Sequence, residues 1–167
     1  MTKSYKNITF MDAQIIFRNF TGEERKKNPA GNRNFCLVVE DEVQAQQMFE
    51  EGWNVRILPP RTDDEVAKHY IPVAVSYRNN DSFPVCVYIV DGNQRTLLNE
   101  DTIGRLDHAD IASVKLTIRP RYWDDDNGQT KIKAYLKTMY VTLNVDELDQ
   151  WWHASGNHGM TSEDTPF

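Results

Sequence analysis

Apolar and polar residues alternate along most of the chain, which is the pattern of β-strands that bury one face. In the segment 8–20, for example, Met11, Ala13, Ile15 and Phe17 recur at every second position. Comparable runs predict further strands over 33–40, 53–57, 70–78, 84–90, 94–98, 111–119 and 130–143. The sequence therefore predicts a mainly β protein.

Helices and turns are expected at few places. Asp41 can cap a helix in which Ala45, Met48 and Phe49 share one face and which Gly52 ends. A second short helix is expected over 99–107. The dipeptide at 91–92, Asp-Gly, indicates a tight hairpin, residues 124–128 form another turn, and 21–32 carry the Gly and Pro residues of a mobile loop.

The order of these elements matches a known architecture. A five-stranded Greek-key barrel of the oligonucleotide/oligosaccharide-binding (OB) type has three strands, a helix and two more strands. We therefore expect an elaborated OB-like barrel with short helices as one domain over residues 1–145, with a β-sandwich as the alternative. From residue 146 the pattern fades, so we expect 146–167 to form an acidic, partly flexible and disordered tail.

Composition narrows the class of protein. The chain has 167 residues, of which 40% are hydrophobic and 26% charged, as in one globular domain. Cys36 and Cys86 both lie in apolar runs and are expected to be buried and unbridged. Neither a membrane-spanning run nor a signal peptide is recognisable in the sequence, so we expect a cytoplasmic protein with no membrane partner.

The formal net charge of −6 comes mainly from the tail. Five of the 25 acids and none of the 19 Lys and Arg residues lie from position 144 onward. The rest of the chain is therefore close to neutral and cannot attract nucleic acid by bulk charge, although local basic stripes still can.

The last two predicted strands carry such a stripe. Side chains alternate between the two faces of a strand, so Val114, Leu116 and Ile118 form an apolar face and leave the cations opposite. If the turn pairs the two strands, one surface gathers Lys115, Arg119, Arg121, Trp123, Lys131, Lys133, Tyr135 and Lys137. Cations neutralise phosphates and rings stack on exposed bases, which suits single-stranded nucleic acid. The alternative is a solvated sheet face, but solubility requires charge and not tryptophan.

The loop between the first two predicted strands is also basic. In OB barrels the loops after the first and the fourth strand flank the binding face. We therefore expect phosphate contacts from Arg25, Lys26, Lys27 and Arg33, with Phe35 and Tyr122 as additional stacking rings. The alternative is a surface charge run neutralised by neighbouring glutamates.

The C-terminus combines acids with a terminal ring and carboxylate. Glu163, Asp164, Pro166 and Phe167 could be captured by an apolar pocket ringed with Arg and Lys on a partner protein. The alternative is a tail that only keeps the protein soluble.

Signatures of catalysis are lacking in the sequence. The acidic run 124–128 misses the calcium-binding spacing, His153 and His158 have no cysteine partner, and no glycine-rich phosphate loop is present. We therefore expect a protein that is not an enzyme and binds neither cofactor nor metal. Two other hypotheses remain open: an acidic DNA mimic that inhibits a host nuclease or repair enzyme, and a structural β-domain.

The tail, Glu-Asp-Thr-Pro-Phe, resembles the acidic tip of bacterial single-stranded DNA-binding proteins, although Thr165 precedes the proline where those tips usually carry an apolar residue. The body resembles bacteriophage single-stranded DNA-binding proteins with an elaborated OB fold, in the segments 16–20, 31–35, 52–55 and 132–141. The resemblance implies a protein that coats single-stranded DNA with low sequence preference during phage replication or recombination. It also implies recruitment of replication or recombination proteins through the tip, in the cytoplasm of an infected bacterium.

Overall fold

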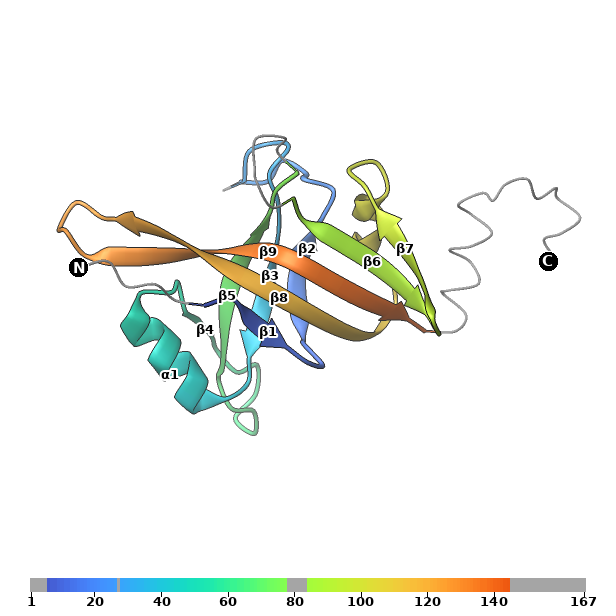
Figure 1. Cartoon of the computed structure of the whole chain (residues 1–167). Helices are drawn as coiled ribbons and strands as arrows, with labels where there is room; N and C mark the ends of the chain where they lie inside the picture. Colours follow the sequence, from blue (N-terminus) through green and yellow to red (C-terminus); the bar gives the residue numbers. More distant parts are fainter. Residues whose placement is uncertain (1–5, 27, 78–83, 145–167) are drawn as a thin grey trace, which may run out of the picture.

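The computed structural model describes residues 6–26, 28–77 and 84–144. Within these ranges nine strands form a single sheet, accompanied by one α-helix, α1 (Glu42–Glu51), and one 3-10 helix, η1 (Ile103–Asp107). The mainly β class predicted from the sequence is confirmed (Figure 1). The strands are β1 (Ile8–Phe10), β2 (Ile15–Asn19), β3 (Arg33–Val39), β4 (Arg56–Leu58), β5 (Lys68–Val75), β6 (Cys86–Asp91), β7 (Gln94–Leu98), β8 (Ile111–Asp124) and β9 (Thr130–Leu143).

The strand order closes into a barrel. It runs β1-β8-β9-β5-β3-β2, so both ends of the sheet are successive segments of the N-terminal strand. The short connection between them is held on both sides, because the Ala13 amide donates to the Val114 carbonyl at 2.8 Å and the Val38 amide donates to the Gln14 carbonyl at 2.9 Å. The pair β5–β9 is parallel and the other pairs on this path are antiparallel. This is the Greek-key connectivity of an OB barrel, as predicted.

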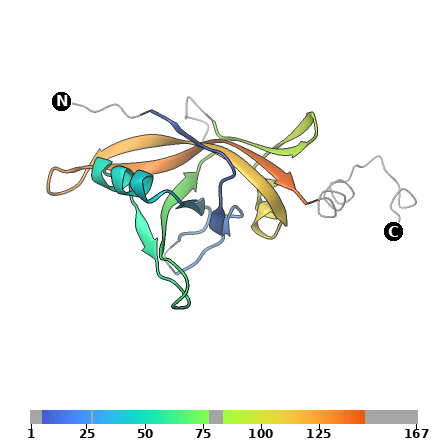
Figure 2. The same cartoon turned by 90° about the horizontal axis from the view of Figure 1, so that it is seen from below.

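Two insertions extend the barrel. The first contains α1 and β4 and lies between β3 and β5, and the second contains the β6–β7 hairpin and η1 and lies between β5 and β8. Strand β6 pairs in parallel with residues 138–141 of β9. The β6–β7 hairpin therefore continues the sheet at one end of the β8–β9 ribbon, while the turn of that ribbon extends past α1 at the other end (Figures 1 and 2).

The core is made from alternate residues of the long strands, with a change of phase in the middle of β9 and a second register shift at the start of β8, between Ile111 and Ser113. In β9, Ile132, Ala134 and Leu136 are buried, but beyond them Met139 is buried instead of an even-numbered residue. The pairing of β8 with β9 shifts at this point, where Thr117 pairs with Thr138 and Ile118 pairs with Leu136. The extra residue, Lys137, forms a β-bulge, so the side chains on both sides of it can remain on one face of the sheet.

Helix α1 ends against the turn of the β8–β9 hairpin. Asp41 caps its first turn by accepting bonds from Val43 N at 2.9 Å and Gln44 N at 3.3 Å. Gly52 ends it with φ = 111°, where a Cβ atom would lie 2.6 Å from the Thr130 carbonyl oxygen. The Ile132 amide donates to the Gly52 carbonyl at 2.9 Å, which ties the helix end to β9.

The structure differs from several of the predictions made from the sequence. Phe49 does not share the buried face of Ala45 and Met48 but is 61% exposed. Cys36 and Cys86 are half-buried rather than fully buried, and both are free. Among the residues of the three described ranges, none of the helices is long and apolar enough to cross a membrane. The predicted tail, 146–167, and Lys27 lie outside the described residues.

Candidate nucleic-acid interface

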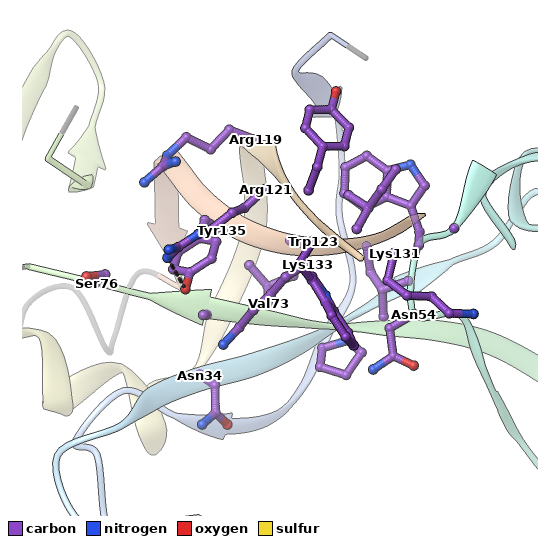
Figure 3. A pocket seen from close by; sticks show the side chains of 18 of the residues that line it. Asn34, Asn54, Val73, Ser76, Arg119, Arg121, Trp123, Lys131, Lys133 and Tyr135 are labelled. Carbon is purple, nitrogen blue, oxygen red and sulfur yellow. Dashed lines mark hydrogen bonds between the residues drawn. The ribbon is translucent and has the colours of Figure 1, made fainter. Parts of the chain in front are cut away.

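A groove of about 1920 Å³ lies between the β8–β9 hairpin, strands β3 and β5, and the end of α1. Asn34 of β3 and Ser76 after β5 lie on one side of it, and Arg121 and Lys133 of the hairpin extend into it (Figure 3). An OB barrel binds its ligands on the corresponding strands and loops. The groove is therefore the candidate binding site.

The side of the groove that is formed by the β8–β9 hairpin, which we call the hairpin wall, carries several cations around one aromatic ring. Arg119 pairs across the strands with Tyr135, and Arg121 pairs with Lys133. The Arg119 guanidinium lies 5.1 Å from the centre of the Tyr135 ring, Lys133 Nζ lies 5.3 Å from it and the Arg121 guanidinium 5.9 Å. Arg121 also donates to the Tyr135 hydroxyl at 3.4 Å. Three cations thus hold one tyrosine on the groove wall.

Trp123 lies at the turn end of the same face, opposite Lys131 in the register. Its side chain is 53% exposed and lines the groove, so a flat ligand can reach its ring. The neighbouring Tyr122 is half-buried and packs against the core. The sequence prediction of a shared face is therefore confirmed for Arg119, Arg121, Trp123, Lys131, Lys133 and Tyr135, whereas Tyr122 is less accessible to a base than expected.

The groove as a whole is not basic. Its lining includes Glu50, Glu51, Glu100, Asp124 and Asp125 as well as the hairpin cations. Asp125 is engaged in the turn, where it accepts bonds from Asn127 N and Gln129 N at 2.9 Å each, and Asp124 accepts a bond from the Thr130 hydroxyl at 3.2 Å. In the part of the chain that the structure describes, neither Arg121 nor Lys133 forms an ion pair with a carboxylate. The positive charge available to a ligand is therefore concentrated on the hairpin wall.

Arg33 lines the groove but is already engaged. Its guanidinium lies 4.0 Å from a Glu100 carboxylate oxygen, donates to the Glu100 carbonyl at 3.4 Å and lies 5.7 Å from the Tyr77 ring. Burial raises the pKa of Tyr77 to about 12, although Arg33 acts to lower it. Arg33 is thus placed as predicted, with less charge to offer than the hairpin cations.

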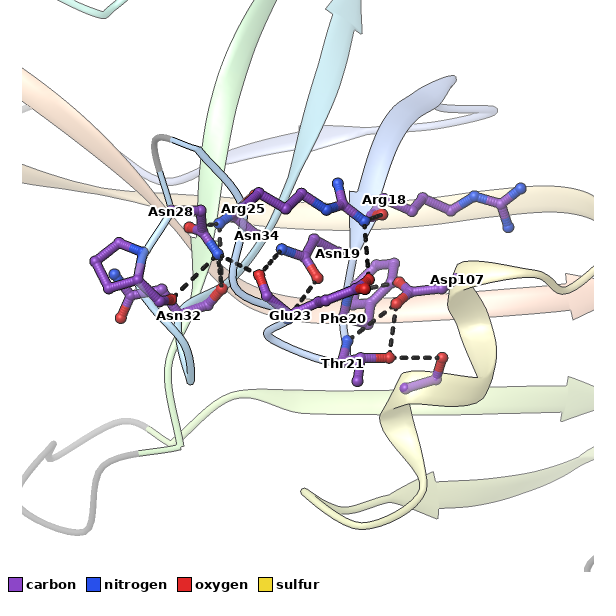
Figure 4. Close-up of polar contacts among 12 residues, drawn as sticks. Arg18, Asn19, Phe20, Thr21, Glu23, Arg25, Asn28, Asn32, Asn34 and Asp107 are labelled. Atoms are coloured by element: carbon purple, nitrogen blue, oxygen red, sulfur yellow. Dashed lines mark hydrogen bonds and ion pairs between the residues drawn. The ribbon is translucent and has the colours of Figure 1, made fainter.

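An asparagine network shapes the loop 20–32 (Figure 4). The Asn28 amide donates to the carbonyls of Glu23 and Asn32 at 3.0 Å each, and accepts a bond from the Asn34 amide at 2.8 Å. Arg25 and Lys26 are exposed in a separate shallow depression, where Arg25 lies 3.7 Å from Glu23. These two cations are therefore not in the groove, although Asn28 lines both hollows.

Three other predicted residues are not placed in the groove. Phe35 is fully buried and stacks on Phe20 with ring centres 5.3 Å apart, so its predicted contact with a base is wrong. Its position in β3 has the same parity as the buried Leu37, a signal that the sequence already contained. Lys115 and Lys137 lie further along the ribbon. The predicted partner-binding residues lie outside the described residues: Glu163, Asp164, Pro166 and Phe167.

The sequence reasoning missed three aromatic residues that line the groove, Phe49, Trp53 and Tyr77, of which Trp53 is almost fully buried. Phe49 follows the buried Met48 and lies on the exposed side of α1, where an aromatic residue is unusual in a soluble helix. Tyr77 could not have been assigned, because it follows the last residue of β5 and its partners come from distant segments. Among the described residues, no three His, Cys, Asp or Glu side chains gather as metal ligands would.

Comparison with known proteins shows which family the chain is related to. The model of a family described as a putative phage ssDNA-binding domain matches residues 1–157. The chain belongs to this family. The resemblance of the body to phage single-stranded DNA-binding proteins is thereby confirmed. None of the curated proteins matches the chain in sequence.

Two solved structures are similar at low identity. The single-stranded DNA-binding protein from bacteriophage Enc34 is 12% identical with a TM-score of 0.49, over 95% of this chain and 88% of that chain. The single-stranded DNA-binding protein gp2.5, encoded by bacteriophage T7, is 8% identical with a TM-score of 0.44, over 93% of this chain and 97% of that chain.

Proposed function

We propose that this protein binds single-stranded DNA in the groove along the β8–β9 hairpin and catalyses no reaction. The observation that carries the proposal is the hairpin wall, where Arg119, Arg121 and Lys133 surround the Tyr135 ring. The exposed Trp123 lies on the same face. Membership of a phage ssDNA-binding domain family supports the same ligand.

Each group has a physical role in this proposal. Arg121, Lys131 and Lys133 contact successive phosphates, while Trp123 and Tyr135 stack on bases. Stacked duplex bases cannot reach these rings, so single strands are preferred. Phosphate contacts and stacking read no base edges, which gives low sequence preference.

The remaining basic residues extend the path of the bound DNA strand beyond the hairpin wall. Arg25 and Lys26 belong to the loop that flanks the groove, and we assign them, together with Lys27, to phosphates where the strand leaves it. Arg33 contributes less because Glu100 already neutralises part of its charge. Residues 1–145 form the DNA-binding domain in this proposal, and 146–167 form the acidic tail.

The wider role that we propose goes beyond DNA binding and is supported by the phage family of the chain. The protein coats single-stranded DNA during phage replication or recombination in the cytoplasm of an infected bacterium, and the tip residues recruit partner proteins. Deleting Pro166 and Phe167 is expected to leave DNA affinity unchanged and to abolish binding to those proteins. If the truncated protein retained every partner, the tail would not be a docking segment.

The groove is tested by titrating a fluorescent dT oligonucleotide into the wild-type protein and two variants. Trp123→Ala is expected to weaken binding about 5- to 150-fold, because one stacked base contributes about 1–3 kcal/mol. Ile57→Ala is the matched control, since Ile57 is 64% exposed and does not line the groove. Equal affinities of the two variants, with circular dichroism showing both folded, would contradict the proposed function.

A further inference from the structure

A second cluster of rings and cations lies on the inserted β6–β7 hairpin and its neighbours. Tyr88 of β6 lies opposite Tyr140 of β9, and Tyr140 lies opposite Lys115 of β8. The two tyrosine rings stack with centres 5.2 Å apart and planes 11° from parallel. These side chains form a row across the sheet, outside the groove.

Two cations flank this tyrosine pair. The Arg95 guanidinium lies 5.2 Å from the centre of the Tyr88 ring and 5.7 Å from that of Tyr140, and it donates to the Tyr140 hydroxyl at 3.4 Å. Lys115 Nζ lies 5.9 Å from the centre of the Tyr140 ring. Within the described ranges, neither Arg95 nor Lys115 forms an ion pair. Leu97, opposite Tyr88 in β7, is 58% exposed. We call Tyr88, Arg95, Lys115 and Tyr140 the outer cluster.

The outer cluster is continuous with the groove wall. Lys115, Thr117 and Arg119 are alternate residues of β8 and lie on one face of it, over about 13 Å at the usual rise per residue. On β9, Leu136 and Met139 are both buried, so the bulge places Lys137 and Thr138 together on the outward face. Lys137 thus stands between the groove and the outer cluster.

The bulge is what joins the two clusters. Positions 135 and 140 have opposite parity, so in a regular strand Tyr135 and Tyr140 would lie on opposite faces. With the extra residue at 137 both rings lie on the outward side, each beside cations from β8. A sheet face that only needed to be soluble would require charges, and neither stacked tyrosines nor an exposed leucine.

We propose that the outer cluster is a second contact surface for single-stranded DNA, reached by the strand that leaves the groove past Lys137. The inference rests on the proposed function and extends it, because Tyr88 and Arg95 of the cluster belong to an insertion outside the five-stranded barrel. Arg95, Lys115 and Lys137 contact phosphates, and the tyrosine pair offers its exposed ring surface to a base. The protein therefore covers a longer stretch of DNA than the groove alone can hold.

Oligonucleotide length separates the two surfaces. We choose dT oligomers of about 5 nucleotides, near the lower end of the site size of one OB fold, and of about 20 nucleotides, beyond its upper end. The variant of the outer cluster is Arg95→Gln with Lys115→Gln, and that of the groove is Arg121→Gln. Arg61→Gln with Lys68→Gln is the matched control, since both residues are exposed and lie outside the groove and the outer cluster.

The outer-cluster variant is expected to bind the long oligomer about 2- to 30-fold more weakly than the control variant, the range for two exposed ion pairs. It should bind the short oligomer equally well. For the long oligomer, the slope of log affinity against log salt should become less negative by about 1.4, because two phosphate contacts are lost.

Other results overturn the inference. If the outer-cluster variant matches the control at both lengths while Arg121→Gln weakens both, the outer cluster does not bind DNA and the groove function stands. If all variants match the control, the proposed function fails as well. If the outer-cluster variant instead changes the sedimentation coefficient of the free protein, this face is an interface between copies and the inference is wrong.

Discussion

The contact between α1 and the turn of the β8–β9 hairpin can be tested by adding one methyl group at Gly52. In Gly52→Ala, the added Cβ would lie 2.6 Å from the Thr130 carbonyl oxygen, at a φ of 111°. A non-glycine residue in this backbone region costs about 1–3 kcal/mol, and the close contact adds about 1–3 kcal/mol because helix and hairpin must separate. Together these effects lower the unfolding free energy by about 2–6 kcal/mol, which corresponds to a fall in Tm of about 4–24 °C for a chain of this size.

Gly92→Ala is the matched control. Gly92 also has a positive φ, 61°, but an added Cβ would meet no atom within 4 Å. The Gly92→Ala variant should therefore lose only about 1–2 kcal/mol of unfolding free energy, because of backbone strain. The assay is urea unfolding of both variants together with dT titration of the folded proteins. Gly52→Ala should also bind DNA more weakly, because the shifted turn carries Trp123. Equal stability and equal affinity of the two variants would refute the reasoning.

Four substitutions have defined effects on stability. Phe35→Ala should cost about 3–5 kcal/mol in urea unfolding because Phe35 is fully buried, whereas Trp123→Ala should stay within about 0.5 kcal/mol. Asp107→Ala should cost about 1–3 kcal/mol in the same assay, since this carboxylate accepts bonds from the amides of Phe20 and Thr21. The raised pKa of Tyr77, about 12, contributes stability that is complete below pH 10 and lost as pH rises through 12. Tyr77→Phe should lose less stability than the wild type between pH 10 and 12, and parallel urea midpoints across that range would contradict this.

Strand alternation predicted the fold well because most strands bury one face. It placed Arg121, Trp123, Lys131 and Lys133 on one face without coordinates, since side chains of one parity lie on the same face of a strand. The bulge at Lys137 could not be predicted, because nothing in a run of alternating residues marks an unpaired one. The continuity between the two ring clusters was therefore not apparent from the sequence.

Errors arose where tertiary contacts decide burial. Phe35 was assigned to DNA because it follows a basic loop, although its parity in β3 places it in the core against Phe20. The helical spacing from Ala45 predicts Phe49 on the buried face of α1, but the helix turns Phe49 towards the groove. Arg33 was placed correctly, yet its neutralisation by Glu100 depends on two segments that only the fold brings together.

The most direct measurement of the central claim is the affinity of the wild-type protein for dT oligomers and for duplex of equal length, at several salt concentrations. If the cations assigned to phosphates in the groove and its flanking loop bind a flexible strand, the oligomer should bind more tightly than the duplex, with a log–log salt slope near −4 for about six neutralised phosphates and a steeper slope for oligomers that reach the outer cluster. Equal affinity for both ligands, or a slope near zero, would contradict the account.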